Sequence, residues 1–172
     1  MSLSHILTVS PLTRVRRHHA LEHATLQILA RKCPHLSIAG YSDVRGFWIV
    51  GNAPTEIVRD AVDEALSRLR AGESQLAIHP NCGTNFVVTG LLAGSAAWLV
   101  MAFGKGGWRR RLQDWPLVVA ASALAAIFAQ PLGLKLQAHV TTDARTGEMQ
   151  IVEIKVRQAR GLGVHRIITR HT

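Results

Sequence analysis

Two long uncharged stretches stand out from an otherwise mixed pattern of apolar and polar positions. They cover residues 86–103, FVVTGLLAGSAAWLVMAF, and residues 115–134, WPLVVAASALAAIFAQPLGL. A helix of about 18–20 residues is about 27–30 Å long, which matches the hydrocarbon thickness of a bilayer. The pattern predicts a transmembrane helical hairpin over residues 86–134. Two buried helices of a soluble protein are the alternative.

The residues beside these stretches are typical of a membrane setting. Trp108 and Trp115 suit the interfacial belt, and Gly90 and Gly94 form a GxxxG motif that lets membrane helices approach closely. That motif can serve the hairpin itself, a homodimer or contact with other membrane-protein subunits. The connecting segment is basic and carries Lys105, Arg109, Arg110 and Arg111.

Positive charge is nearly balanced across the predicted hairpin. Four basic residues lie in the connecting segment, and Arg70, Lys135 and Arg145 flank the outer ends. A cytoplasmic connecting segment would require export of the N-terminal lobe, although no signal peptide is visible. We therefore expect both termini in the cytoplasm of a bacterium, with the hairpin in its inner membrane.

The segments on either side of the hairpin predict an α+β fold. Residues 1–85 suit a small two-layer lobe with the order helix, strand, strand, helix, strand. The elements expected in this lobe are helices over 12–32 and 54–71 and strands over 36–41, 46–50 and 75–79.

The last part of the chain, residues 135–172, predicts a β segment that packs on the first lobe. Residues 135–142 and 149–158 alternate between apolar and polar positions, and residues 143–147 between them suit a turn. The chain is thus expected to comprise a lobe over 1–85, a membrane hairpin over 86–134 and a C-terminal β-hairpin.

Charge and composition narrow the class of function. The chain has 20 basic and 11 acidic residues and a net charge of +9, which suits an anionic partner. The basic residues are scattered over three segments and aromatic residues are few, so we expect a phospholipid bilayer and no nucleic acid. Cys33 and Cys82 cannot form a disulfide framework. We expect them to be reduced thiols, one redox pair or metal ligands.

The residues that carry candidate chemistry lie in the first helix. His19, Glu22 and His23 form an HxxEH motif on its apolar face, and helical geometry points both imidazoles the same way. Two such nitrogens can hold one zinc ion, and the adjacent Glu22 can take a proton from a zinc-bound water. The alternative is a metal-free helix in which Glu22 pairs with His18 or with a neighbouring arginine.

A zinc site needs further ligands, and the segment before the first apolar stretch offers two. His79 and Cys82 have HxxC spacing within HPNCGTN, which can chelate a metal. The alternative is a turn that starts a helix, with Thr84 or Asn85 as its cap. Weaker candidates for the missing ligand are His139, His165, Glu64 and Glu73.

The motifs resemble two known groups. HxxEH resembles the motif of the inverzincin metallopeptidases, although the downstream glutamate of the insulinase-like members has no counterpart here. HALEHATLQIL, HPNCGTN and VHRIITR together resemble an uncharacterised bacterial family of small two-span membrane proteins, over nearly the whole chain. The second resemblance implies the two-span architecture and no activity.

Two functions from different classes follow. The first is an integral membrane metalloprotein, a zinc-dependent peptidase-like hydrolase at the membrane surface. In it His19 and His23 bind the metal, Glu22 activates water, and His79 or Cys82 completes the coordination shell. The second is a non-enzymatic accessory or assembly subunit of a larger membrane protein complex. The HxxEH motif favours the first, and the lack of a secure third ligand favours the second.

Overall fold

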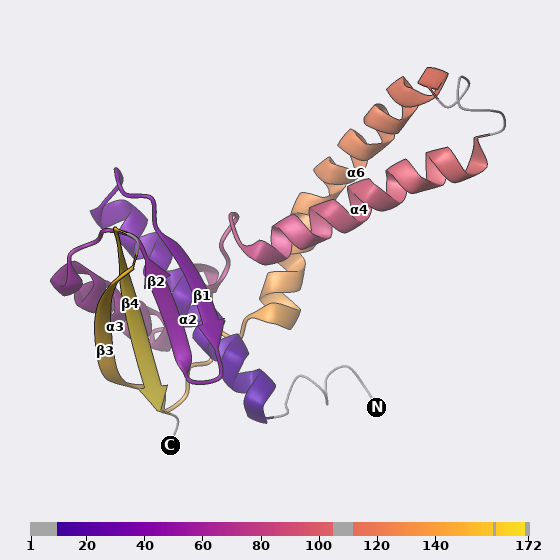
Figure 1. Ribbon diagram of the computed structural model, residues 1–172. Coiled ribbons are helices and arrows are strands. Elements are labelled where there is room, and N and C mark those ends of the chain that lie inside the picture. Colours follow the sequence, from indigo (N-terminus) through magenta and orange to yellow (C-terminus); the bar gives the residue numbers. More distant parts are fainter. Residues whose placement is uncertain (1–9, 105–111, 160, 171–172) are drawn as a thin grey trace. The chain divides into compact units, whose positions relative to one another are not determined.

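A computed structural model describes residues 10–104, 112–159 and 161–170 (Figure 1). The chain divides into two compact units, one of Met1–His79 with Gln137–Thr172 and one of Pro80–Leu136. Each unit is considered by itself below. The basic cluster and the interfacial tryptophan predicted for the connecting segment lie outside the described residues; these are Lys105, Trp108, Arg109, Arg110 and Arg111.

The first unit contains a four-stranded antiparallel sheet in the order β1-β2-β4-β3. Gly46, the first residue of the second strand, has a φ of 144°, and a Cβ there would overlap the carbonyl oxygen of Ile167. Glycine alone tolerates both conditions, so it lets the second strand pair closely with the fourth. The strands are β1 (Ala39–Asp43), β2 (Gly46–Val50), β3 (Gln150–Ala159) and β4 (Leu162–Arg170).

Two helices complete this unit and bury its core. Helices α2 (Ser10–Lys32) and α3 (Thr55–Arg70) lie behind the sheet in Figure 1 and pack against each other, and α2 also contacts β1 and β2. Burying each large apolar side chain stabilises the unit by about 1.5–3 kcal/mol. The largest fully buried apolar side chains are Leu21, Leu29, Phe47, Ile49, Val58, Val62, Met149 and Ile167.

The fold class predicted from the sequence, α+β, is confirmed, but one strand predicted for the first lobe is wrong. Residues 75–79 were expected to be extended, and the chain instead forms a short 3-10 helix, η1 (Ser74–Ala77). A side chain of α2 supplies the hydrogen bonds that a neighbouring strand would otherwise make, because Gln27 donates to the carbonyl oxygens of Leu76 and Ile78. Backbone groups satisfied in this way need no sheet partner.

The C-terminal β-hairpin is present, but it uses different strands from those expected. Residues 135–142 are not a strand: α6 (Trp115–Leu136) continues directly into a π-helical turn, η2 (Gln137–Thr141). The hairpin consists of β3 and β4, and β4 also pairs with β2. Residues 162–170 were missed as a strand, because polar and apolar residues come there in adjacent pairs and do not alternate.

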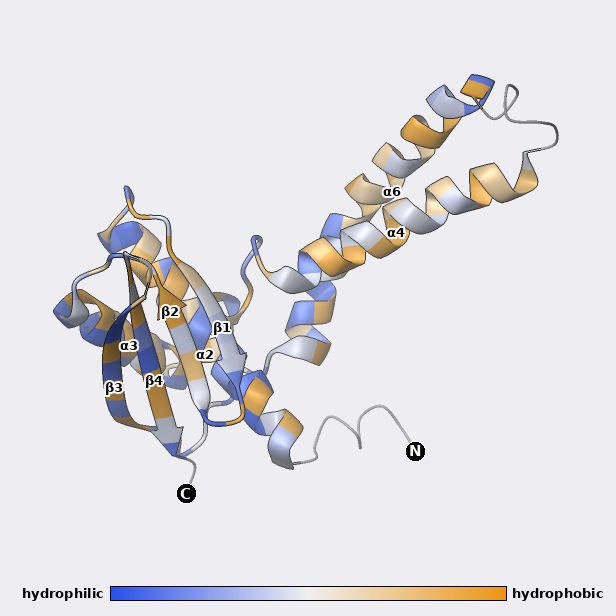
Figure 2. Cartoon of the chain, in the orientation of Figure 1, coloured by the Kyte–Doolittle hydropathy of each residue, from blue (hydrophilic) through white to orange (hydrophobic). Residues whose placement is uncertain are grey.

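The second unit is a pair of apolar helices, α4 (Gly83–Phe103) and α6. Both are long and apolar enough to cross a membrane, and they pack against each other. Figure 2 shows that hydrophobic and neutral residues cover most of both helices. The exposed apolar side chains of the pair include Phe86, Leu91, Trp98, Phe103, Ile127 and Phe128.

Small residues allow the close approach of these two helices at specific points. A Cβ on Gly133 of α6 would lie 3.0 Å from the Cγ of Asn85 on α4, and the Ser122 hydroxyl donates to the carbonyl oxygen of Ala93. The predicted GxxxG motif lies elsewhere on α4. A Cβ on Gly90 or Gly94 would meet nothing within 4 Å, so the hairpin itself does not use that motif.

Candidate metal centre

The HxxEH motif lies on α2, and the helix brings its two histidines together. The ring centroids of His19 and His23 are 4.2 Å apart with the rings at 63°, and their ligand nitrogens lie within 4.8 Å of each other. Zinc–nitrogen bonds of about 2.0–2.1 Å in a tetrahedral site place two nitrogens about 3.3 Å apart. The bound of 4.8 Å on the two nitrogens includes the separation that one shared ion would require.

Both imidazoles are oriented by backbone carbonyl groups from segments distant in sequence. The Nδ1 of His19 lies 3.0 Å from the carbonyl oxygen of Thr141, and the Nδ1 of His23 lies 2.7 Å from that of Ala77. A carbonyl oxygen only accepts, so each Nδ1 carries the hydrogen and donates it. The lone pair of each ring is then on Nε2, the arrangement usual for metal-binding histidines.

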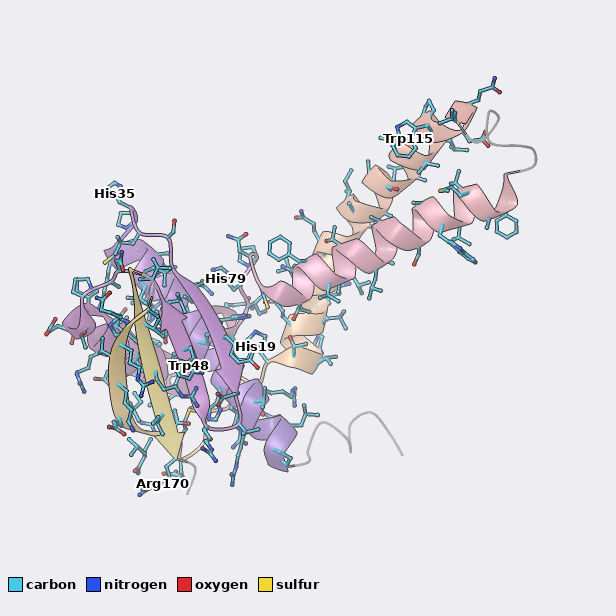
Figure 3. All side chains as sticks on the ribbon, in the orientation of Figure 1. His19, His35, Trp48, His79, Trp115 and Arg170 are labelled. Atoms are coloured by element: carbon cyan, nitrogen blue, oxygen red, sulfur yellow. The ribbon has the colours of Figure 1, made fainter. Side chains whose placement is uncertain are left out.

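His79 is a third histidine beside this pair. Its ring centroid lies 5.7 Å from that of His23. Two imidazoles that share a tetrahedral zinc ion have centroids about 5 Å apart, given zinc–nitrogen bonds of about 2.0–2.1 Å. The two observed separations, 4.2 and 5.7 Å, lie on either side of this value. Figure 3 labels His19 and His79, which come from α2 and from the end of the segment that follows η1.

Glu22 is buried between α2 and the edge strand β1. Only 4% of the residue is exposed, and its Oε2 accepts a short hydrogen bond from the hydroxyl of Ser42. A Cβ on Gly40 would overlap the Glu22 carboxylate, so the glycine leaves room for it. The sequence gives no signal for the roles of Ser42 and Gly40, because nothing in the pattern of β1 indicates which residues face the carboxylate.

His18, which the metal-free interpretation considers as a partner of Glu22, contacts β1 and β4. Its Nδ1 donates to the carbonyl oxygen of Asp43 at 2.7 Å, and its Nε2 lies 2.6 Å from the hydroxyl of Thr169. Burial lowers the pKa of His18 and outweighs the opposing effect of the Asp43 carbonyl, so the neutral ring is favoured. Both of its nitrogens therefore hold α2 to the sheet.

Most of the other predicted ligands have structural contacts within their own unit. Cys82 belongs to the second unit, where it caps α4 and its sulfur accepts from the Thr84 N–H at 3.4 Å. The weaker candidates of the first unit have other structural contacts. Glu64 pairs with Lys32 and Arg68, Glu73 with Arg68, and His165 with the Thr55 hydroxyl, while His139 is an exposed residue of η2.

Taken together, these features define an α+β protein with a histidine cluster on helix α2 and two helices long enough to cross a membrane. The chain belongs to the family described as Domain of unknown function (DUF6391), which matches residues 14–154. It is also similar to an uncharacterized protein of Picosynechococcus sp., with 37% identity over 147 residues. That match covers 74% of this chain and 65% of the relative, so the chain spans about two thirds of the relative's length. No solved structure matches the chain.

Proposed function

We propose that this protein is an integral membrane metalloprotein, with a zinc ion held by His19, His23 and His79 and peptide hydrolysis at the membrane surface. The observation that carries the proposal is the pair of carbonyl groups that fix Nδ1–H of His19 and His23. Each ring then carries its lone pair on Nε2, and the ligand nitrogens of the two histidines lie within 4.8 Å of each other, which is a donor set that zinc prefers.

The proposed chemistry assigns each side chain a separate task. His19, His23 and His79 would hold the zinc ion, and the zinc would supply an acidified water for hydrolysis. Glu22, which adjoins His23 in the motif, would act as the base that accepts a proton from that water, and the Ser42 hydroxyl donates to its carboxylate and orients it. The sequence prediction that Cys82 is a ligand stays a prediction and is tested by its replacement with serine.

The membrane assignment is supported by the two apolar helices and the positive charge. Helices α4 and α6 expose large apolar side chains along their length, which lipid would cover. A net charge of +9 suits anionic headgroups. We place the protein in a bacterial inner membrane with both termini in the cytoplasm, because this topology needs no export of the N-terminal lobe.

A second function is favoured by one specific observation on α4. Gly90 and Gly94 do not contact α6, and a Cβ on either would meet nothing within 4 Å. A GxxxG face that the hairpin does not use can pack against a second copy of the chain or against another membrane subunit. Under this alternative the protein is a non-enzymatic accessory or assembly subunit, and the buried Glu22 serves only to join α2 to β1.

The substitution Glu22→Gln separates the two functions. If Glu22 is the base, hydrolysis of an unstructured peptide by the detergent-solubilised protein should fall about 10²–10⁴-fold while the zinc content stays unchanged. The exposed Glu73→Gln serves as the matched control and should keep full turnover. Equal turnover of wild type and Glu22→Gln would refute the hydrolase mechanism and leave the subunit interpretation.

A further inference from the structure

The segment that carries His79 is irregular, yet its backbone is held firmly from the α2 side. The amide nitrogen of Gln27 donates to the carbonyl oxygens of Leu76 and Ile78, each at 2.9 Å. Between them, the carbonyl oxygen of Ala77 accepts from His23 at 2.7 Å. Three consecutive carbonyl groups thus bind side chains that stand one turn apart on the same helix face.

A second glutamine holds the same segment from another side. Gln137 is fully buried, and its Oε1 accepts from the His79 backbone N–H at 2.9 Å. The backbone of Gln137 is fixed in turn, because its carbonyl oxygen accepts from both the N–H and the hydroxyl of Thr142. Gln137 therefore holds the backbone of His79 in a defined place.

The turn that contains Gln137 is itself tied to the metal-binding helix. The Arg16 guanidinium donates to the carbonyl oxygens of His139, Val140 and Thr142. The carbonyl oxygen of Thr141, which lies between those of Val140 and Thr142 in the sequence, accepts from His19. One face of α2 thus binds two segments, 76–79 and 137–142, and Gln137 joins these two segments to each other.

We infer that Gln27 and Gln137 are positioning residues that hold His79 in place as the third metal ligand. The inference rests on the proposed function, since it presupposes that His19, His23 and His79 share a metal. Neither amide touches the proposed ion. Both fix the backbone from which the His79 imidazole projects, so the ligand is ordered before the metal binds, and less entropy is lost on binding.

The test measures zinc affinity by competition with a chromophoric chelator. The absorption spectrum of the Co²⁺-substituted protein reports the coordination number. Gln27→Met and Gln137→Met keep the side-chain size and remove the hydrogen bonds. Each should weaken zinc binding about 10–100-fold, as is usual for residues that support a ligand. Gln75→Met, at an exposed glutamine of the same segment, is the matched control and should bind zinc as the wild type does.

A second background distinguishes positioning from a general loss of structure. In His79→Ala protein, the two glutamine substitutions should weaken zinc binding no further, because each acts through His79. The same weakening in both backgrounds, or none in the wild-type background, would overturn the inference. A wild-type protein that binds no zinc would instead refute the proposed function. If one of the glutamine variants does not fold, the other still decides the matter.

Discussion

At the scale of residues, neighbouring histidines of one helix have different roles that their partners determine. His18 uses both ring nitrogens to hold α2 against the sheet, through Asp43 and Thr169. His19 and His23 each use Nδ1 on a backbone carbonyl, which places the lone pair on Nε2. Helical spacing predicts the pairing of His19 with His23, since positions one turn apart share a face. It cannot predict the carbonyl partners, which come from segments more than fifty residues away.

Gly40 provides the space that Glu22 occupies, so a methyl group there should be destabilising. Gly40→Ala should lower the free energy of unfolding by about 1–3 kcal/mol, because the new Cβ would overlap the buried carboxylate. Thermal or denaturant unfolding measures the loss. The loss should disappear when Gly40→Ala is made in a Glu22→Ala background. A similar loss in both backgrounds would show that Glu22 is not the obstacle.

The buried His165 should make part of the free energy of unfolding sensitive to acid. Burial on β4 lowers its pKa, so the unfolded chain takes up a proton at a higher pH than the folded chain. Stability from the neutral ring is therefore fully present above about pH 6.5 and is lost as the pH falls from there towards the folded-state pKa. His165→Gln should flatten this part of the stability profile, measured by unfolding across that range. An unchanged profile would contradict the assignment.

At the scale of elements, side chains of α2 explain why two local strand predictions were wrong. Alternating polarity over 75–79 and 135–142 indicated extended structure, but the carbonyl groups of both segments bind to Gln27, His23, His19 and Arg16. Such tertiary contacts override local patterns. The strands and helices that bury their own apolar face were predictable, because their periodicity follows from the core they form.

Arg16 should be essential for the turn that follows α6. Its buried guanidinium donates to three carbonyl oxygens of residues 139–142. Arg16→Met removes these bonds and leaves carbonyl groups without a donor, so we expect a loss of about 3 kcal/mol in the free energy of unfolding. The exposed Arg14→Met, on the same helix, is the control and should change stability by less than about 0.5 kcal/mol. Equal losses in the two variants would show that the carbonyl contacts contribute little.

At the scale of the whole molecule, the chain inserts an apolar hairpin between the two parts of one α+β unit. The sequence predicts the hairpin well, because two uncharged stretches of spanning length need no tertiary context to be recognised. The path of the C-terminal segment is harder to predict. Its strand β4 pairs with β2, more than a hundred residues earlier, and only the folded sheet specifies that register.

A membrane-spanning hairpin determines the conditions that extract the protein from a membrane. It should remain in the membrane fraction after high-salt and alkaline carbonate washes and require detergent for release, because apolar burial does not depend on ionic strength. Immunoblots of pellet and supernatant measure this behaviour. Release by salt alone would mean that the basic surface makes the attachment and that α4 and α6 do not span the bilayer.

The measurement that tests the metal centre most directly is the zinc content of the purified protein. Elemental analysis would compare the wild type with His19→Ala/His23→Ala, and the exposed His35→Ala would serve as the control. The proposal predicts about one equivalent of zinc in the wild type and in His35→Ala, and almost none in the double variant. Full metal occupancy in the double variant, or no metal in wild-type protein purified from zinc-replete cells, would contradict the assignment of His19 and His23 as ligands.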